Sequence, residues 1–257
     1  MSLVAQPPIW RSAFIAWCDA VAAVGSMTSV AFAAFVLALM IEFAHAILFG
    51  VPAGQGGSEP TEMLRYLAVA ALQGVVEVPL AIAVHRYVLL GEITGSYSLD
   101  FAHPRFRRFF AFAMALNMVW AIGLVASDAA AATGLEATTT LALCLALLAM
   151  IMAVTVRTLI LFPAIAVDAT GADWPNAVDD SKGHSWRIFC ILVTTALPAL
   201  VASLIMYALF GDPTDRSIPA SVAYAVTIAA VNVLMVAAFA AAASRLFRVL
   251  AARLARA

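Results

Sequence analysis

Three ionisable side chains lie inside long apolar segments, where each could bind an ion or a polar group. Glu77 lies about 13 residues into the apolar run Leu64–Leu90, and Pro79 follows two residues later. A proline removes one backbone hydrogen bond and loosens the helix around it. A carboxyl group at that depth could bind a cation or a proton, because ionisable groups inside spanning helices usually have a function. A protonated or paired glutamate in a packed bundle is the alternative.

The other two ionisable side chains are Arg86 and Arg157, toward the ends of the second and fourth apolar runs. Both could project into one vestibule and bind an anionic headgroup or substrate. Both could equally extend to the membrane interface, with their stems covering apolar surface. Arg86 is nine residues from Glu77, about 13 Å along a helix, so we do not expect these two to pair.

The sequence predicts no metal site, no cofactor and no catalytic centre. Glu42 and His45 are one helical turn apart but do not form a zinc-protease motif. Cys18, Cys144 and Cys190 fit no metal, haem or disulfide spacing. Nucleophile-elbow and phosphate-loop motifs are missing as well. We therefore expect a protein that is not an enzyme.

Composition places the chain in a membrane. Its 257 residues are 65% hydrophobic and only 11% charged, more apolar surface than a soluble fold of this size could bury. A formal net charge of −1 gives no indication of nucleic-acid binding.

Six apolar runs have about the 20 residues that a spanning helix needs. They are continuous rather than alternating, which argues against a β-barrel. The expected fold is all-α, a polytopic membrane helix bundle in one domain. The predicted spans are Ser26–Leu48, Leu64–Leu90, Phe109–Ala126, Thr138–Val167, Ile188–Phe210 and Ala220–Phe247.

A separate interfacial helix is predicted over Ile9–Val24. Its apolar side chains recur at steps of three and four residues, while Arg11 and Asp19 lie off that stripe. Gly25 and Ser26 would form the bend into the first span. One long tilted helix from Arg11 to Leu48 is the alternative.

Basic residues predict the orientation. With six spans, one side carries ten of them and the other only Arg65 and Arg216, so we expect both termini in the cytoplasm of a bacterial inner membrane. The ten are Arg11, Arg105, Arg107, Arg108, Lys182, Arg187, Arg245, Arg248, Arg253 and Arg256.

Three segments carry a resemblance. His85–Glu92 (HRYVLLGE) closes one run, Arg157–Asp168 (RTLILFPAIAVD) closes another, and Ser181–Phe189 (SKGHSWRIF) leads into the next. Together they resemble a group of bacterial six-span inner-membrane proteins that is similar to the membrane domain attached to some glycerophosphodiester phosphodiesterases. The likeness covers about Arg86 to Pro198 and implies fold and location. Because no soluble catalytic domain is expected here, the phosphodiesterase reaction is not carried over.

Two functions follow as hypotheses. The first is a non-enzymatic, lipid-contacting scaffold or accessory subunit of an envelope complex, with membrane lipids and a protein of that complex as partners; the many alanines favour close helix packing. The alternative is a small carrier for a lipid or amphiphilic anion, in which Glu77 couples to a proton and Arg86 with Arg157 attracts the anion. An intramembrane enzyme would need two converging acidic or nucleophilic groups in a water-filled cavity.

Overall fold

The described part of the chain consists of helices and their connections. A computed structural model describes all residues except 1–7, 50–59, 133–135, 211–217 and 256–257. The helices are α1 (Ile9–Ser26), α2 (Thr28–Phe49), α3 (Pro60–Leu90), α4 (Pro104–Ala132), α5 (Ala137–Thr158), α6 (Leu161–Ala166), α7 (Trp174–Asp180), α8 (Ser185–Phe210) and α9 (Ile218–Leu250).

Several helices are long and apolar enough to cross a membrane, which confirms the all-α, multi-pass character of the chain. Four candidate spans are found among the described residues, or five if the bent pair α1–α2 counts as one. The four are Leu67–Leu90, Ala137–Ala166, Ser185–Phe210 and Pro219–Leu250.

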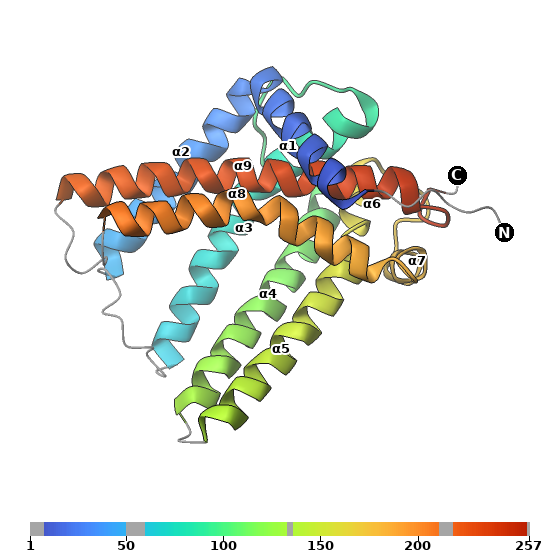
Figure 1. The fold of residues 1–257 in the computed structure, drawn as a ribbon. Helices are drawn as coiled ribbons and strands as arrows, with labels where there is room; N and C mark the ends of the chain where they lie inside the picture. The colour runs from blue at the N-terminus through green and yellow to red at the C-terminus, as the bar shows by residue number, and fades with distance from the viewer. Residues whose placement is uncertain (1–7, 50–59, 133–135, 211–217, 256–257) are drawn as a thin grey trace.

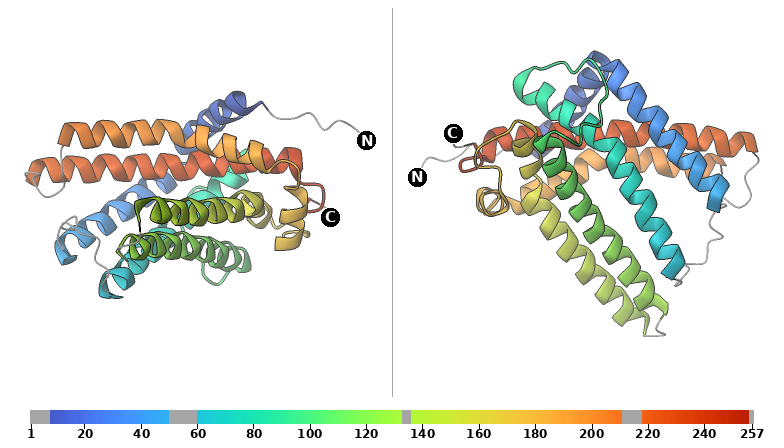
Figure 2. Two further views of the ribbon diagram at one scale, coloured as in Figure 1. Left: turned by 60° about the horizontal axis from the view of Figure 1, so that its bottom comes forward. Right: turned by 180° about the vertical axis from the view of Figure 1, so that it is seen from behind.

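The long helices form two pairs that diverge from one end of the molecule (Figure 1). α8 and α9 run side by side, and α4 and α5 pack together as a second pair. α3 contacts both α4 and α9 and so connects the two pairs. The views in Figure 2 show α4 and α5 lying on the opposite side of the molecule from α8. α1 begins and α9 ends at the end where the pairs converge (Figure 1).

A sharp bend separates α1 from α2. The two helices meet at 96° around Met27, so the alternative of one continuous helix from Arg11 to Leu48 is wrong. α1 packs on α8 and α9 through four alanines, whose small side chains allow close approach. These are Ala13, Ala16, Ala20 and Ala23. The predicted apolar stripe is divided: Trp10 and Phe14 are 72% and 70% exposed, whereas Trp17 packs against the core.

The fourth predicted span contains a break. α5 ends at Thr158, and the short helix α6 follows after Leu159 and Ile160. Pro163 explains the break, because it has no N–H to donate and its ring would clash with the carbonyl of Leu159 in a continuous helix. α6 contacts α3, α4 and α9.

The segment that follows α9 is hydrogen-bonded to the end of α7. Asp173 caps α7 by accepting a hydrogen bond from the Asn176 N–H at 2.9 Å. The Asp180 carboxylate in turn accepts from the backbone N–H groups of Arg253 and Leu254, at 2.9 to 3.1 Å. These contacts connect the last described residues to the connection between α6 and α8.

Candidate functional site

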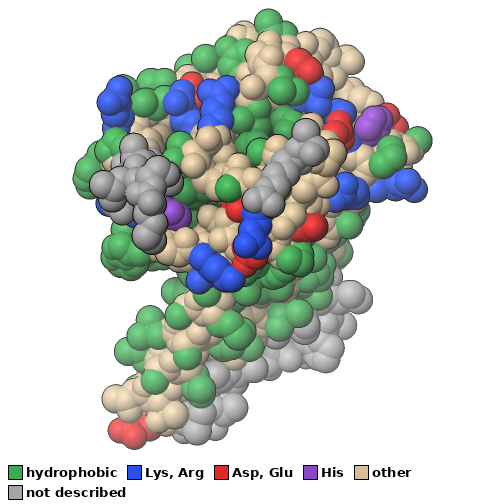
Figure 3. All heavy atoms as spheres, turned by 90° about the vertical axis from the view of Figure 1, so that its right-hand side faces the viewer, with side chains coloured by type: hydrophobic (Ala, Val, Ile, Leu, Met, Phe, Trp, Pro, Cys, Tyr) green, Lys and Arg blue, Asp and Glu red, His purple; other side chains and the backbone are tan. Residues whose placement is uncertain are grey.

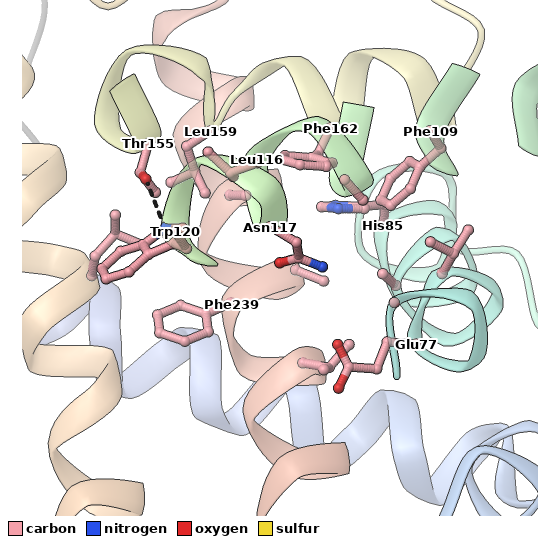
Figure 4. A pocket seen from close by; sticks show the side chains of 18 of the residues that line it. Glu77, His85, Phe109, Leu116, Asn117, Trp120, Thr155, Leu159, Phe162 and Phe239 are labelled. Atoms are coloured by element: carbon pink, nitrogen blue, oxygen red, sulfur yellow. Dashed lines mark hydrogen bonds between the residues drawn. The ribbon is translucent and has the colours of Figure 1, made fainter. Parts of the chain in front are cut away.

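A cavity of about 460 Å³ lies where the diverging helix pairs meet (Figure 4). Side chains from α3, α4, α5, α6, α8 and α9 line it, and most of them are apolar. Val193 of α8 lines the cavity and is 43% exposed. A cavity of this size suits one small ligand or part of a lipid.

Glu77 places a carboxyl group inside this cavity, as Figure 4 shows. It lies 13 residues before the end of α3, about 20 Å along the helix axis and near the middle of the candidate span Leu67–Leu90. Among the described residues, none forms a hydrogen bond or ion pair with this carboxyl group. An unpaired carboxyl group at this depth is costly unless a ligand or a proton satisfies it.

Pro79 follows Glu77 within α3, and the helix continues through it. The carbonyl of Val76, three residues before the proline, accepts a hydrogen bond from the Tyr97 hydroxyl at 2.9 Å. Burial raises the pKa of Tyr97 to about 12, so its phenol stays protonated and able to donate. The turn that carries Glu77 is therefore stabilised from outside the helix.

Asn117 and Trp120 are the polar side chains that α4 contributes to the cavity. The Asn117 amide lies against Gly74, where a Cβ atom would be 3.2 Å from its Nδ2. The Trp120 indole donates to the Thr155 hydroxyl at 3.2 Å and so joins α4 to α5 (Figure 4). Asn117 thus adds a second polar group to the cavity that could bind a ligand, besides Glu77. Trp120 and Thr155 form a hydrogen bond with each other instead.

His85 lies in the cavity wall nearer the end where the helices converge. Its Nδ1 is 2.8 Å from the hydroxyl of Ser244, a hydrogen bond between α3 and α9. The ring of Phe109 packs 5.8 Å away, centroid to centroid. Because they are eight positions apart in one helix, about 12 Å along its axis, Glu77 and His85 do not converge on one reacting atom.

Arg86 lies outside the cavity, in a set of ion pairs. It makes two hydrogen bonds to Glu92, at 2.7 and 2.8 Å, and donates to the carbonyl of Ala166 at 3.0 Å. Its guanidinium is also 3.9 Å from Asp168, which pairs closely with Arg105. The hydrogen bond from Arg105, followed by the charges of Arg105 and Arg86, holds the pKa of Asp168 below its usual range.

Arg157 lies apart from both Glu77 and Arg86. It donates to the carbonyl of Val178 at 3.4 Å and so connects α5 to α7. Neither Arg157 nor Arg86 lines the cavity with Glu77. Of the three residues singled out from the sequence, only Glu77 is thus part of the cavity, and the structure does not bring the two arginines into one vestibule.

Charged side chains gather at the end where α1 begins and α9 ends. Figure 3 views this end and shows many Lys and Arg side chains over it, while the arm that extends away from it shows mainly apolar and other uncharged side chains. The same charge distribution follows from the sequence positions of the basic residues.

Sequence reasoning did not find Asn117, Trp120 or the partner of His85. Asn117 could have been identified from the sequence, because it is a polar amide side chain inside an apolar run. The pairing of His85 with Ser244 joins residues 159 positions apart and has no local signature. Among the described residues, no group of three or more His, Cys, Asp and Glu side chains could hold a metal ion.

Comparisons with known proteins add no family to this description. No protein-family model matches the chain, and neither a curated protein nor a solved structure does. The resemblance to the membrane domain of glycerophosphodiester phosphodiesterases therefore stays a prediction.

Proposed function

We propose that the chain crosses a bacterial inner membrane six times, by α2, α3, α4, α5, α8 and α9, with both termini in the cytoplasm. The four or five candidate spans and the basic residues gathered at one end support this topology. α1 then lies along the inner interface, since it meets α2 at 96° and exposes Trp10 and Phe14.

Cysteine labelling in intact cells tests the topology. In a variant with Cys18, Cys144 and Cys190 replaced by serine, a cysteine at Ala131 reacts with a membrane-impermeant maleimide added outside. A cysteine at Lys182, whose side chain is 64% exposed, reacts only after the cells are opened. The reverse pattern would show that the orientation is wrong.

The function that the geometry supports best is binding of an amphiphilic molecule within the membrane. The observation that carries it is the carboxyl group of Glu77, which has no partner among the described residues and lies in a largely apolar cavity between candidate spans. An apolar wall with a few polar groups is typical of sites that bind a ligand in a fixed orientation. Such a ligand would enter from the lipid phase past Val193, which lines the cavity and is 43% exposed.

The polar group of the ligand should donate hydrogen bonds. Glu77 offers acceptor oxygens, Asn117 offers both an acceptor and donors, and no arginine or lysine is found among the described residues that line the cavity. A hydroxyl or amine group therefore fits this cavity better than the anion expected from Arg86 and Arg157. Those arginines are occupied elsewhere, by Glu92 and by the carbonyl of Val178.

Native mass spectrometry of the protein extracted with its surrounding lipid tests this function. The wild type should retain a bound amphiphile, and Glu77→Gln should lose it by about tenfold or more, because one charge-assisted hydrogen bond is removed. Glu42→Gln is the matched control: Glu42 accepts a hydrogen bond from Gln73 and does not line the cavity. Equal retention by wild type and Glu77→Gln would refute the role of the cavity.

A transport measurement distinguishes a carrier from a protein that binds its ligand without moving it across the membrane. In proteoliposomes, a proton-coupled carrier loses flux in Glu77→Gln, whereas the protein stays folded. The predicted scaffold or accessory role remains a hypothesis, which a stoichiometric second polypeptide in the same mass spectra would support. An enzyme is not proposed, because Glu77 and His85 do not converge and the Thr155 hydroxyl donates to the carbonyl of Ile151.

A further inference from the structure

A second pocket, of about 260 Å³, lies between the start of α1 and the end of α9. It is separate from the cavity of Glu77 and shares no lining residue with it. Arg11, Arg245 and Arg248 line it, together with Ser12 and several apolar side chains. Arg11 lies near Arg245 and Arg248 because α1 packs along α9.

Positive charge exceeds negative charge around this pocket. The Asp19 carboxylate forms an ion pair with Arg245 and accepts two hydrogen bonds from it, of 2.5 and 2.9 Å. Arg248 donates one of its N–H groups to the carbonyl of Val88. Arg11 is exposed, and no described residue forms an ion pair or hydrogen bond with it.

Each of the three guanidinium groups keeps N–H donors for a ligand. A guanidinium has five such donors, and Arg245 uses its Nε and Nη2 while Arg248 uses its Nη2. The ion pair with Asp19 also fixes the position of Arg245. The pocket therefore presents oriented donors and two uncompensated positive charges, which suits the oxygens of a phosphate.

Apolar side chains surround these donors. Ile15, Leu246 and Val249 line the same pocket, and Val249 is 43% exposed. Trp10 and Phe14 extend outward from α1 next to it. Arginines beside exposed aromatic and aliphatic groups are typical of surfaces that bind a lipid headgroup and the upper part of its acyl chains.

We propose that this pocket binds the phosphate of an anionic phospholipid of the inner leaflet. Arg11 and Arg248 contact the phosphate oxygens, Arg245 stays paired with Asp19 and adds its remaining donors, and Ile15 and Val249 contact the acyl chains. The bound lipid thereby joins α1 to α9. This site goes beyond the proposed function and takes a ligand of opposite charge preference to that of the Glu77 cavity.

Lipid binding to the purified full chain in phosphatidylcholine nanodiscs tests the proposal. Phosphatidylglycerol added to these nanodiscs should bind the wild type more tightly than added phosphatidylcholine. Arg11→Gln should weaken phosphatidylglycerol binding about fivefold, and Arg11→Gln with Arg248→Gln about 25-fold, since each arginine near an anionic headgroup contributes about that factor. Because Arg11 is exposed and unpaired among the described residues, its single variant should fold normally.

Arg107→Gln is the control, because it removes the same charge from an exposed position outside the pocket. Equal weakening by Arg107→Gln and Arg11→Gln would mean general attraction to the surface and would overturn the site. Inorganic phosphate at millimolar concentration should not displace the lipid. Displacement would show that the pocket binds soluble phosphate rather than a lipid, and would overturn the proposal too.

Discussion

The indole Nε1 of Trp17 in α1 donates a hydrogen bond to the backbone carbonyl of Thr195 in α8, at 3.0 Å. Thr195 is three residues before Pro198, a proline inside α8. Tyr97 contacts α3 in the same way, since it donates to Val76, three residues before Pro79. In both helices an aromatic side chain from another element thus stabilises the turn whose hydrogen bonding the proline disturbs.

Tyr97→Phe should therefore lower the free energy of unfolding by about 1 kcal/mol, the usual contribution of one hydrogen bond. Only the hydroxyl is removed, so packing stays the same. Thermal unfolding in detergent measures the effect, and Tyr207→Phe, at a residue 58% exposed, should leave the midpoint unchanged. Equal midpoints for wild type and Tyr97→Phe would show that the turn needs no such support.

The ion pair between Asp19 and Arg245 should couple α1 to α9. Asp19→Asn removes one charge from a pair whose side chains are 23% and 33% exposed, so we expect a loss of about 1 kcal/mol. In a double-mutant cycle with Arg245→Gln, the second substitution should cost much less once the first is present. Additive losses would mean that the two side chains do not stabilise each other.

Gly171→Ala should release the C-terminal segment. A Cβ atom there would collide with the carbonyl oxygen of Arg253 and lie 3.1 Å from the Leu254 backbone. Backbone cannot move aside as a flexible side chain can, so we expect faster proteolysis after Leu250 and a loss of about 1 to 3 kcal/mol. Gly95→Ala meets no atom within 4 Å and should behave as the wild type.

Asp168 should make stability depend on acid pH. Its folded pKa lies below the usual 3.8, chiefly because Arg105 donates to it. Its contribution is therefore complete above the unfolded pKa and is lost as the pH falls through the lower, folded pKa. Asp168→Asn removes the charge but tolerates the positive φ of 55° at this position. Below about pH 4 the wild type should lose stability more steeply than this variant.

Local patterns predicted much of the helical structure but little of the site. Apolar runs of about 20 residues predicted α5 with α6, α8 and α9, because hydropathy depends on neighbouring residues. The apolar stripe of α1 predicted an interfacial helix but did not show which side chains pack on the bundle, and the buried residues of α1 are alanines. In a membrane protein, close contact requires small side chains, and large apolar ones can face lipid.

The site depended on long-range packing. Glu77 could be identified because a carboxyl group inside an apolar run is unusual. The sequence could not show that Arg86 pairs with Glu92 or that Arg157 contacts Val178 instead of sharing its vestibule. Those outcomes depend on the segments that follow α3 and α5, where Gly91 has a φ of +70° and Pro163 accounts for the break between α5 and α6.

The position of α9 has a consequence for the order in which the chain is made. α9 contacts α1, α2, α3, α6 and α8, and it is synthesised after all of them. α1, the first described helix to be synthesised, buries its alanines largely against it. The earlier helices therefore remain in the membrane with incomplete contacts until α9 has been synthesised. Truncations that remove α9 should for this reason leave α1 open to protein quality control, whatever the state of α2 to α8.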